Sequence, residues 1–443
     1  MNPKVISGFS KLSKAEKIDW IAKNFITKNT ADVTAIFDTF LCADSDTQRI
    51  IDGFSENTVS NFHLPYGVAP NFVINDKTYC VPMVIEESSV VAAASSAAKY
   101  WLTRGGFHAQ VLSTTKIGQV HFSWTGDFTR LLLAFDELKK ILLSQSAPLV
   151  SNMEQRGGGI RNIELLNMTD LEADYYQLRV SFETCDSMGA NLINSVLESF
   201  GKTMIEFFQN SQFFSENEKN VTILMAILSN YTPDCLVRAW VECPIDQLGT
   251  KSAPDVNLLA QKFYKAVQIA TIDPYRATTH NKGIYNGVDA VVLATGNDFR
   301  AIEACGHTYA ARDGQYRSLS RCSIENGIFR FWIDLPLAVG TVGGLTKLHP
   351  LAKFSLEMLG NPSAKELMQI IAVVGLAQNF AAVKSLVTTG IQQGHMKMHL
   401  GNILLNFQAS GQECDMAQKH FSENAITFSA VREYLEALRK SDL

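Results

Sequence analysis

Asp273-Pro-Tyr-Arg-Ala-Thr-Thr-His-Asn-Lys-Gly-Ile-Tyr-Asn286 is followed closely by Val291-Val-Leu-Ala-Thr-Gly-Asn-Asp298, and these two runs are the most informative part of the sequence. The apolar residues that open the second run predict a buried strand, and its Gly-Asn pair predicts the turn that ends the strand. The turn would leave Asp298 at the rim of a cleft, and we expect Lys282 to lie in a similar irregular segment. A lysine held against an aspartate stays charged and fixed, which suits the stabilisation of an oxyanion. The alternative is a surface loop with an ordinary ion pair.

The length and composition of the chain exclude several classes of protein. With 443 residues, 46% of them hydrophobic and 19% charged, the chain is long enough for two or more domains and is typical of a folded globular protein. The net charge of -5 and the lack of a basic run argue against nucleic-acid binding. The apolar tract at 370–387 is interrupted by Gln378, Asn379 and Lys384, so it predicts a buried helix and not a membrane span.

The cysteines and histidines show no metal-binding pattern. The eight cysteines are scattered without a Cys-x-x-Cys pair, and the nine histidines supply no His-Glu-x-x-His. We therefore expect no metal site and no disulfide framework. The N-terminal residues lack the apolar run of a secretory signal, and a cytoplasmic location is expected.

Two adjacent acids, Glu86 and Glu87, lie where a predicted strand (residues 74–84) meets a helix rich in alanine and serine. Ser88 or Ser89 could cap that helix. The N-terminus of a helix favours the ionised form of a carboxylate, whereas burial opposes it. The small side chains of the helix would let a ligand or another backbone approach closely. The alternative is a pair of solvated acids.

A compact α+β insert is predicted from about residue 112 to residue 220. Alternating apolar residues predict strands at 111–123 and 175–182, and an amphipathic pattern predicts a helix at 131–144 between them. A long helix follows, in which apolar residues recur every four positions at Leu192, Val196, Phe200, Met204 and Phe208.

The turn into that long helix is Cys185-Asp-Ser-Met-Gly-Ala-Asn191. A strand, a glycine turn and a helix N-terminus can form an anion site of the kind that a dinucleotide pyrophosphate requires. The run is not the Gly-x-Gly-x-x-Gly fingerprint, and neither is the run of three glycines at 157–159. The alternative is an ordinary helix that Asp186 or Ser187 caps.

The C-terminal region is predicted to begin after a buried helix at 364–389, which Gly390 ends. His395 follows Gly394 just past this helix, so it can lie on a mobile segment with the glycine as a hinge. The alternative is that His395 only caps the preceding helix. The chain closes with a predicted amphipathic helix whose apolar face holds Phe428, Val431, Leu435 and Leu438.

Taken together, these segments resemble the bacterial, class II form of hydroxymethylglutaryl-CoA reductase. The resemblance runs along nearly the whole chain, with several specific motifs in the same order. The matching segments are Glu56-Asn-Thr-Val, Leu64-Pro-Tyr, Val81-Pro-Met-Val-Ile-Glu-Glu, Val90-Val-Ala-Ala-Ala-Ser, Arg156-Gly-Gly-Gly, Asp186-Ser-Met-Gly-Ala-Asn, Asp273-Pro-Tyr-Arg, Thr279-His-Asn-Lys-Gly, Ala294-Thr-Gly-Asn-Asp, Gly375-Leu-Ala-Gln-Asn and Gly390-Ile-Gln-Gln-Gly-His-Met.

The resemblance implies an α+β fold with three parts. A large, helix-rich domain that binds the acyl-CoA would comprise residues 1–111 and 221–390. A small inserted domain at 112–220 would bind the dinucleotide without the Rossmann fingerprint, and residues 391–443 would form a helical flap. The resemblance also implies a homodimer whose active site lies at the interface.

The resemblance further implies the chemistry and the catalytic residues. The family converts hydroxymethylglutaryl-CoA to mevalonate and coenzyme A in two hydride transfers, in the mevalonate pathway to isoprenoids. Lys282 matches the lysine that stabilises the oxyanion, and Asp298 matches the aspartate that orients it. Glu87 matches the glutamate that supplies a proton to the carbonyl oxygen. His395 matches the flap histidine that protonates the departing thiolate.

Other matching positions would bind the cofactor and the substrate. The dinucleotide segment contains Asp186, Met188, Gly189 and Asn191. The substrate-side segments contain Ser89, Arg276, Thr279 and Asn286. Arg276 could pair with the substrate carboxylate or with a phosphate of coenzyme A.

The choice of cofactor depends on a position shortly before the glycine-rich segment, where members of the family that use only NAD carry an aspartate. The matching residue is Val150 by ungapped counting, or Ala147 if Pro148 and Leu149 anchor the alignment. Neither is acidic, so nothing there repels a 2′-phosphate. We expect NADPH to be preferred, NADH to be tolerated, and the reaction to run toward mevalonate. The alternatives are an NAD-dependent catabolic enzyme and, more distantly, a non-catalytic acyl-CoA-binding protein.

Overall fold

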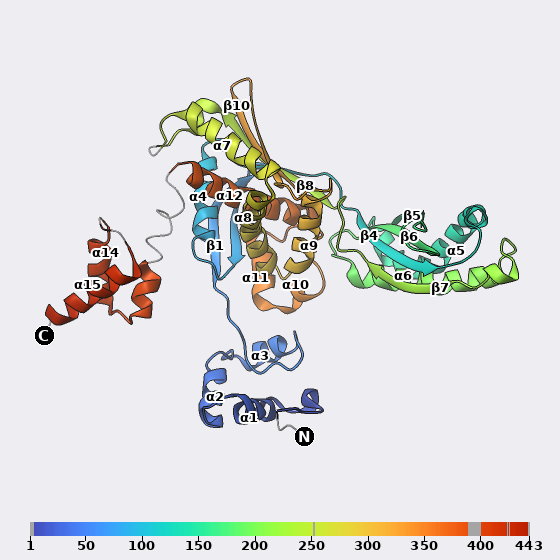
Figure 1. Cartoon of the computed structure of the whole chain (residues 1–443), viewed down its shortest axis with the longest axis horizontal. Coiled ribbons are helices and arrows are strands. Elements are labelled where there is room, and N and C mark those ends of the chain that lie inside the picture. The colour runs from blue at the N-terminus through green and yellow to red at the C-terminus, as the bar shows by residue number, and fades with distance from the viewer. Residues whose placement is uncertain (1–3, 251–252, 389–399, 423, 425, 442–443) are drawn as a thin grey trace.

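The computed structural model describes residues 4–250, 253–388, 400–422, 424 and 426–441. Figure 1 shows a central body of helices and strands, an insert to one side of this body, and helices α1, α2 and α3 near the N-terminus. The body and the insert each combine helices with an antiparallel sheet. The predicted α+β class is therefore confirmed.

The first helices of the chain begin at polar residues that cap them. The side chain of Ser13 forms a capping box with Glu16, and Asn29 and Asp44 each accept a hydrogen bond from a backbone N–H in the first turn. Polar caps therefore start three short helices in this part of the chain. A short 3₁₀ turn, η1 (Phe9–Lys11), precedes α1 (Lys14–Phe25), α2 (Thr30–Asp38) and α3 (Ser45–Asp52).

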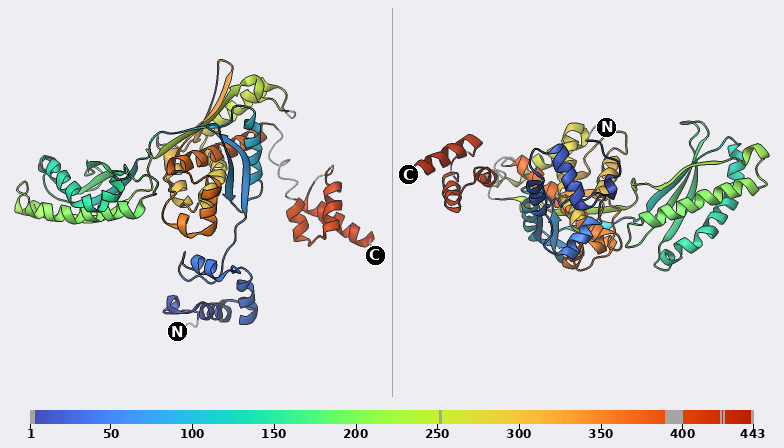
Figure 2. Two further views of the ribbon diagram at one scale, coloured as in Figure 1. Left: turned by 180° about the vertical axis from the view of Figure 1, so that it is seen from behind. Right: turned by 90° about the horizontal axis from the view of Figure 1, so that it is seen from below.

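The central body contains a hairpin, a four-stranded antiparallel sheet and the helices that cover them (Figure 2). The hairpin pairs β1 (Tyr66–Ile74) with β2 (Lys77–Val84), of which only the second is predicted from the sequence. The sheet has the order β3-β8-β10-β9. The remaining elements of the body are β3 (His108–Val111), β8 (Leu236–Pro244), β9 (Ser320–Glu325), β10 (Ile328–Pro336), η3 (Ile245–Leu248), α4 (Val90–Leu102), α7 (Val256–Ile272), α8 (Pro274–Ala294), α9 (Phe299–Ala310), α10 (Leu345–Leu348), α11 (Pro350–Met358) and α12 (Ala364–Val387).

Helix α8 corrects the secondary structure predicted for the two informative runs. The apolar run at 291–293 is the end of this helix and not a strand, and Lys282 lies within the helix and not in an irregular segment. Asp273 caps the helix by accepting a hydrogen bond from the backbone of Tyr275, and proline at the first position favours the helical backbone. A short apolar run cannot distinguish a buried strand from the buried face of a helix.

Helix α12 runs through the core of the body. It begins at a capping box formed by Ser363 and Glu366, and every residue from Ile370 to Phe380 is buried. It packs against α8, α4 and β8. Of the helices in the described ranges, it is the one long and apolar enough to cross a membrane. Its burial bears out the predicted buried helix.

The insert is a four-stranded sheet of order β5-β6-β4-β7 packed against two long helices. The strand predicted at 111–123 is two strands, because β3 belongs to the body and β4 to the insert. The predicted boundary at residue 220 is wrong, because β7 pairs with β4 in this sheet. The elements are β4 (Lys116–Ser123), α5 (Phe128–Glu154), β5 (Gly159–Asn167), β6 (Tyr175–Glu183), α6 (Ala190–Asn210), η2 (Glu216–Glu218) and β7 (Thr222–Leu228).

The described C-terminal residues form a small helical unit with its own core. Residues 400–406 are helical and are followed by α14 (Gly411–His420) and α15 (Phe428–Ser441). The predicted amphipathic face of α15 is present, since Val431 and Leu435 are buried in the core of this unit. Phe428 is about half exposed and packs on the ring of Phe407.

The close approach of α8 to α12 requires a glycine at position 287. A Cβ atom on Gly287 would lie 2.8 Å from the carbonyl oxygen of Val374, whereas a Cβ on Gly283, in the same helix, would meet nothing within 4 Å. We expect Gly287→Ala to lower the free energy of unfolding by about 1–3 kcal/mol through overpacking. Gly283→Ala should instead raise it by about 0.5–1 kcal/mol. Urea denaturation of both variants measures this, and equal effects would contradict the proposed contact.

Candidate active site

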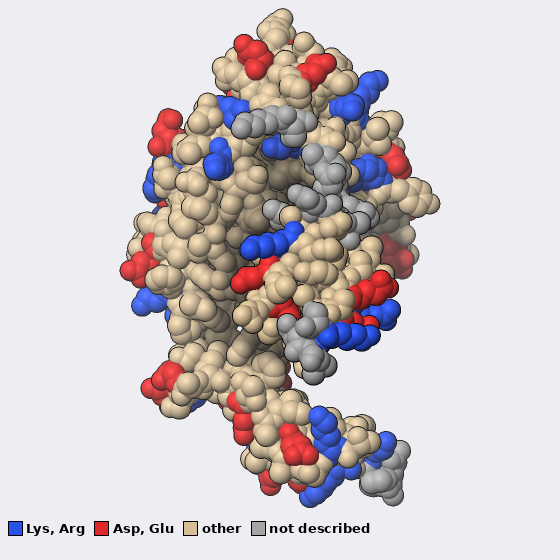
Figure 3. Space-filling view, turned by 90° about the vertical axis from the view of Figure 1, so that its left-hand side faces the viewer, with Lys and Arg blue, Asp and Glu red and all other residues tan. Residues whose placement is uncertain are grey.

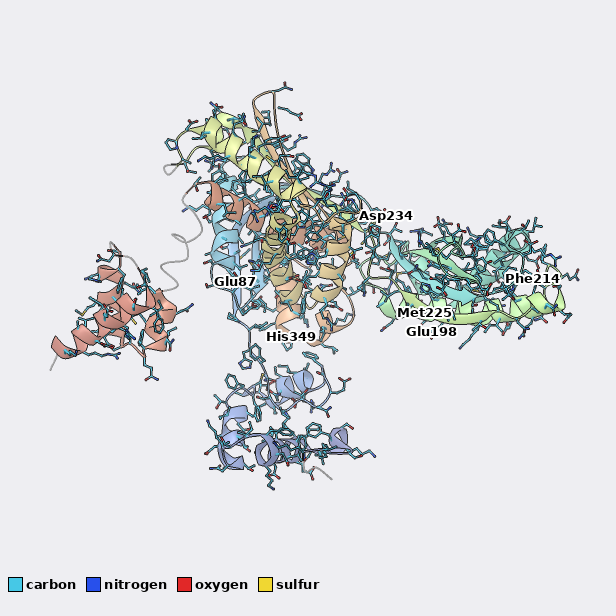
Figure 4. All side chains as sticks on the ribbon, in the orientation of Figure 1. Glu87, Glu198, Phe214, Met225, Asp234 and His349 are labelled. Carbon is cyan, nitrogen blue, oxygen red and sulfur yellow. The ribbon has the colours of Figure 1, made fainter. Side chains whose placement is uncertain are left out.

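One cavity of about 690 Å³ lies between the start of α4, the N-terminal half of α8 and the C-terminal half of α12. Figure 4 labels Glu87, which lies just before α4. The cavity brings together residues from segments that are far apart in the sequence. All of the substrate-side residues predicted from the sequence line it, together with two of the catalytic ones: Glu87, Ser89, Arg276, Thr279, Lys282 and Asn286.

An ion pair between Lys282 and Glu87 lies in this cavity. The Nζ atom of Lys282 donates a hydrogen bond to Oε2 of Glu87 at 2.6 Å, and the two side chains are 59% and 41% exposed. A pair this exposed adds little to stability. Both charged groups therefore remain accessible to a ligand. Within one chain, the partner of Lys282 is Glu87 and not an aspartate.

Helix α8 directs its polar residues to the cavity by helical spacing. Thr279, Lys282 and Asn286 follow one another at intervals of three and four residues, which places them on one face. Ile284 and Val288, on another face, are buried against the body. The same helix thus supplies both core packing and one wall of the cavity.

The start of α4 forms another wall. Ser89 is the N-cap residue, with a φ of 75°, and its side chain makes no capping hydrogen bond, so the predicted serine cap is wrong in its detail. Ala93, Ser96 and Ala97 also line the cavity. Their small side chains leave room for a ligand beside the helix, as the composition predicts.

Arg276 is half-buried on the wall of the cavity. Burial lowers the pKa of its guanidinium group. In the described ranges, no carboxylate forms an ion pair with it. Arg276 is therefore available to pair with an anionic group of a ligand.

Asp298 lies away from this cavity, at the start of α9. It accepts hydrogen bonds from the backbone of Arg300 and Ala301 and pairs with the Arg300 guanidinium at 3.0 Å. Burial acts to raise the pKa of Asp298, but the hydrogen bonds and charge of Arg300 outweigh it and lower the pKa below its usual value. Ala294, where α8 ends, is twelve residues beyond Lys282, which is about 18 Å of helix. The structure thus does not bring Asp298 to Lys282 within one chain.

The residue before Asp298 links α9 to the predicted dinucleotide segment. The side-chain oxygen of Asn297 accepts a hydrogen bond from the backbone of Gly340. A Cβ atom on Gly340 would lie 2.5 Å from the backbone nitrogen of Met188. Asp298 is therefore next to the predicted dinucleotide segment, while Lys282 lines the cavity.

The dinucleotide segment has the predicted strand, turn and helix, but its cap differs from the prediction. Gly189 is the N-cap of α6, with a φ of 87°, and a Cβ atom there would lie 2.4 Å from the Thr184 side chain. Asp186 does not cap α6, because its Oδ1 accepts a hydrogen bond from the backbone of Ala364 at the start of α12. Asp186 thus fastens the insert to the body. Met188 is partly buried, and Asn191 is exposed in the first turn of α6.

The two candidate positions for cofactor discrimination differ in exposure. Val150 is buried in the core of the insert, whereas Ala147 is exposed on α5. Of these two positions, only 147 therefore presents its side chain to solvent. His395 and Gly394 lie outside the described residues.

The sequence interpretation assigned no role to several polar residues beside the cavity. Gln378, Asn379 and Lys384 line it, and the signal that could have found them is their presence in an otherwise apolar helix. His280 is buried beside them, with its Nε2 atom 2.6 Å from the hydroxyl of Ser320. Burial lowers the pKa of His280 to about 3, so this histidine is neutral and structural.

Figure 3 shows acidic and basic side chains interspersed over the face of the molecule that it presents. That face carries no extended area of one sign.

The chain matches known proteins over nearly its whole length. Residues 14–400 match the family described as Hydroxymethylglutaryl-coenzyme A reductase. The chain belongs to this family. It is 36% identical to 3-hydroxy-3-methylglutaryl-coenzyme A reductase of Archaeoglobus fulgidus, over 98% of this chain and 94% of that protein. It is 33% identical to a probable reductase of Borreliella burgdorferi, over 79% of this chain and 77% of that protein.

Solved structures agree with this membership. The reductase of Streptococcus pneumoniae superposes with a TM-score of 0.71 at 37% identity, over 98% of this chain and 100% of that one. A class II reductase structure from the same organism, bound to NADPH in open conformations, has a TM-score of 0.70 at 38% identity, over 86% of this chain and 100% of that one. The resemblance read from the motifs is confirmed, and the chain is an oxidoreductase of the hydroxymethylglutaryl-CoA reductase family.

Two carboxyl groups join the helices that carry Lys282 and Asp298. Asp289 on α8 lies against Glu303 on α9, and burial, together with the charge and hydrogen bonding of Glu303, raises the pKa of Asp289 to about 8. Tyr285 and His307 are the other titratable groups that face this pair. The two carboxyl groups therefore share a proton at neutral pH.

This shared proton makes stability depend on pH. Because the pKa of Asp289 is raised above its unfolded value of about 3.9, its contribution is complete below about pH 4 and is lost as the pH rises toward 8. We expect Asp289→Asn to reduce the fall in unfolding free energy between pH 5 and 8 by about 1–2 kcal/mol, measured by urea denaturation.

Asp313→Asn is the control for this prediction. The hydrogen bond from Arg317 lowers the pKa of the exposed Asp313, so its contribution is lost only as the pH falls. The control should leave the slope between pH 5 and 8 unchanged. If the unfolding free energy of Asp289→Asn fell between pH 5 and 8 as steeply as that of the wild type, this pair would not hold the proton.

Proposed function

We propose that this chain reduces hydroxymethylglutaryl-CoA to mevalonate and coenzyme A by two successive hydride transfers, with NADPH preferred and NADH tolerated. The observation that carries the proposal is the Glu87–Lys282 ion pair, open to a cavity that also holds Arg276, a cation with no carboxylate partner among the described residues. In a thioester with a remote carboxylate, the carbonyl would lie against the ion pair and the carboxylate would pair with Arg276. The reaction would serve the biosynthesis of isoprenoids in the cytoplasm.

In this proposal the reacting carbonyl lies against the ion pair. Negative charge develops on the carbonyl oxygen during reduction, and a fixed cation such as Lys282 stabilises that charge more than it stabilises the neutral carbonyl. Glu87, hydrogen-bonded to Lys282, supplies the proton that the oxygen takes up. His395 would protonate the thiolate of coenzyme A. Arg276 would bind the substrate carboxylate, with Ser89, Thr279 and Asn286 as polar contacts.

The dinucleotide segment fits a nicotinamide cofactor. The first turn of α6 holds no acidic residue, so no carboxylate there would repel a pyrophosphate at the N-terminus of this helix. Asp186, Met188 and Asn191 would complete the contact. When bound, the nicotinamide supplies the hydride. The exposed Ala147 presents no charge to repel a 2′-phosphate, which favours NADPH over the NAD-dependent catabolic alternative.

The placement of Asp298 supports a homodimer with the active site at the interface. Asp298 and the dinucleotide segment lie at one end of α8, and the substrate cavity lies toward the other, about 18 Å of helix away. Two chains related by a two-fold axis can exchange these ends, so that each site takes Glu87 and Lys282 from one chain and Asp298 from the other. In each chain, residues 1–111 and 229–390 would bind the acyl-CoA, 112–228 the dinucleotide, and 391–443 would form the flap.

Turnover with purified protein tests the function. Mixing the protein with hydroxymethylglutaryl-CoA and NADPH should consume nicotinamide absorbance, and NADH should be used more slowly. Lys282→Ala should lower kcat by about 100-fold or more, because the oxyanion loses its cation. Folded protein that shows no turnover with either cofactor would favour a non-catalytic acyl-CoA-binding role.

Mixing two inactive variants tests the shared site. Lys282→Ala and Asp298→Ala should each be inactive alone, but a mixed dimer has one site with both residues intact. Random reassociation should restore about a quarter of wild-type activity, since half of the dimers are mixed and each has one working site of two. A mixture of Lys282→Ala and Glu87→Gln is the control, because these residues come from one chain. Recovery in the control but not in the test pair would refute the exchange.

A further inference from the structure

A second unpaired cation, Lys384, lines the far end of the substrate cavity. It lies on α12, and its Nζ atom is 4.3 Å from the centre of the Tyr100 ring at the C-terminal end of α4. Glu87 lies just before the N-terminal end of the same helix. The cavity thus extends along α4 between an ion pair at one end and a single lysine at the other.

Lys384 is half-buried without a counter-charge. In the part of the chain that the structure describes, no carboxylate pairs with it, and the charged group that faces it is Arg104. Burial, and then the charge of Arg104, lower the pKa of Lys384. The rings of Tyr100 and Phe380 supply the attraction that holds the ammonium group in place. An anion that entered the cavity would relieve this uncompensated charge.

The distance along α4 indicates which anion this is. From Ser89 to Tyr100 is eleven residues, or about 16 Å of helix. The substrate carboxylate is four carbon–carbon bonds from the thioester carbon, so it reaches at most about 6 Å from the reacting centre. When the thioester lies at Lys282, the substrate carboxylate is therefore too far from Lys384 to pair with it. The phosphates of coenzyme A are at the other end of the substrate, beyond the thioester sulfur.

Small side chains keep the path between these two points open. Ala93, Ser96 and Ala97 line the cavity on the α4 side, and Ala381 and Ser385 line it on the α12 side. None of them is long enough to close the space between the helices. A narrow, flexible chain such as the pantetheine arm of coenzyme A fits such a path.

We propose that Lys384 binds a phosphate group of coenzyme A and thereby selects coenzyme A thioesters over thioesters that lack phosphate. The proposal rests on the acyl-CoA substrate proposed above. Lys384 would act in substrate binding alone, because it lies far from the reacting carbonyl.

Steady-state kinetics with matched substrates test the proposal. Lys384→Met keeps the length of the side chain and removes its charge. It should raise KM for hydroxymethylglutaryl-CoA by roughly tenfold or more with kcat little changed, because a charge-assisted hydrogen bond is lost. It should leave KM unchanged for hydroxymethylglutaryl-pantetheine, which has the carboxylate but no phosphate, and for NADPH. Lys384→Arg should retain most of the affinity.

The controls separate this role from packing and from the proposed function itself. Lys99→Met removes an exposed lysine of α4 that lies outside the cavity and should change nothing. Calorimetric binding of free coenzyme A, dephospho-coenzyme A and pantetheine gives the same comparison without turnover. Dephospho-coenzyme A shows whether the 3′-phosphate or the pyrophosphate is bound. The proposal would be overturned if Lys384→Met lost the same affinity for ligands with and without phosphate. It would also be overturned if the variant lost no affinity for coenzyme A or its thioester. A wild-type protein that binds coenzyme A but has no activity would refute the proposed reaction alone.

Discussion

The contact between α8 and α12 is the constraint on which the site depends. The two helices approach closely because each presents a glycine to the other, and a Cβ atom on Gly287 or on Gly375 would lie 2.8 Å from an atom of the opposite helix. Burial of α12 along this contact supplies a large part of the core. The same contact determines where Lys282 and Gln378 lie on the wall of the cavity. A change that separates the two helices would therefore alter both the core and the position of Lys282.

Helix α8 also acts as a rigid spacer. Lys282 lies in its interior and Asp298 lies just past its end, so a regular helix holds their backbones apart in any conformation that keeps α8 intact. Two residues that are close in sequence therefore lie apart along one helix. In the dimer proposed above, each active site would take one of them from each chain. Asp289 on α8 lies against Glu303 on α9, and this contact links α8 to the helix that begins just after Asp298.

The sequence predicts local structure better than it predicts contacts between distant segments. The capped helices near the N-terminus and the buried α12 follow from Ser13, Ser363 and the apolar pattern, because these signals are local. The helical structure at the end of α8 does not follow from the sequence, because a short apolar run is equally typical of a buried strand. The partner of Lys282 is determined by tertiary packing, which the spacing of residues along the sequence does not indicate. Aspartate is a residue type that often caps helices, but the carboxylate of Asp186 accepts a hydrogen bond from the start of α12 instead. The expected catalytic and substrate-side residues come from resemblance to a family and not from a pattern of spacing.

The cavity differs in charge from the chain as a whole. Its lining holds Arg276, Lys282 and Lys384 against the single carboxylate of Glu87, so it carries an excess of positive charge in a chain whose net charge is -5. In the described ranges Arg276 and Lys384 are partly buried without a carboxylate partner, which costs stability, and a protein selected for stability alone would pair or expose them. A ligand with several negative charges removes that cost on binding. The local field therefore favours a ligand that carries several negative charges, as the proposed substrate does.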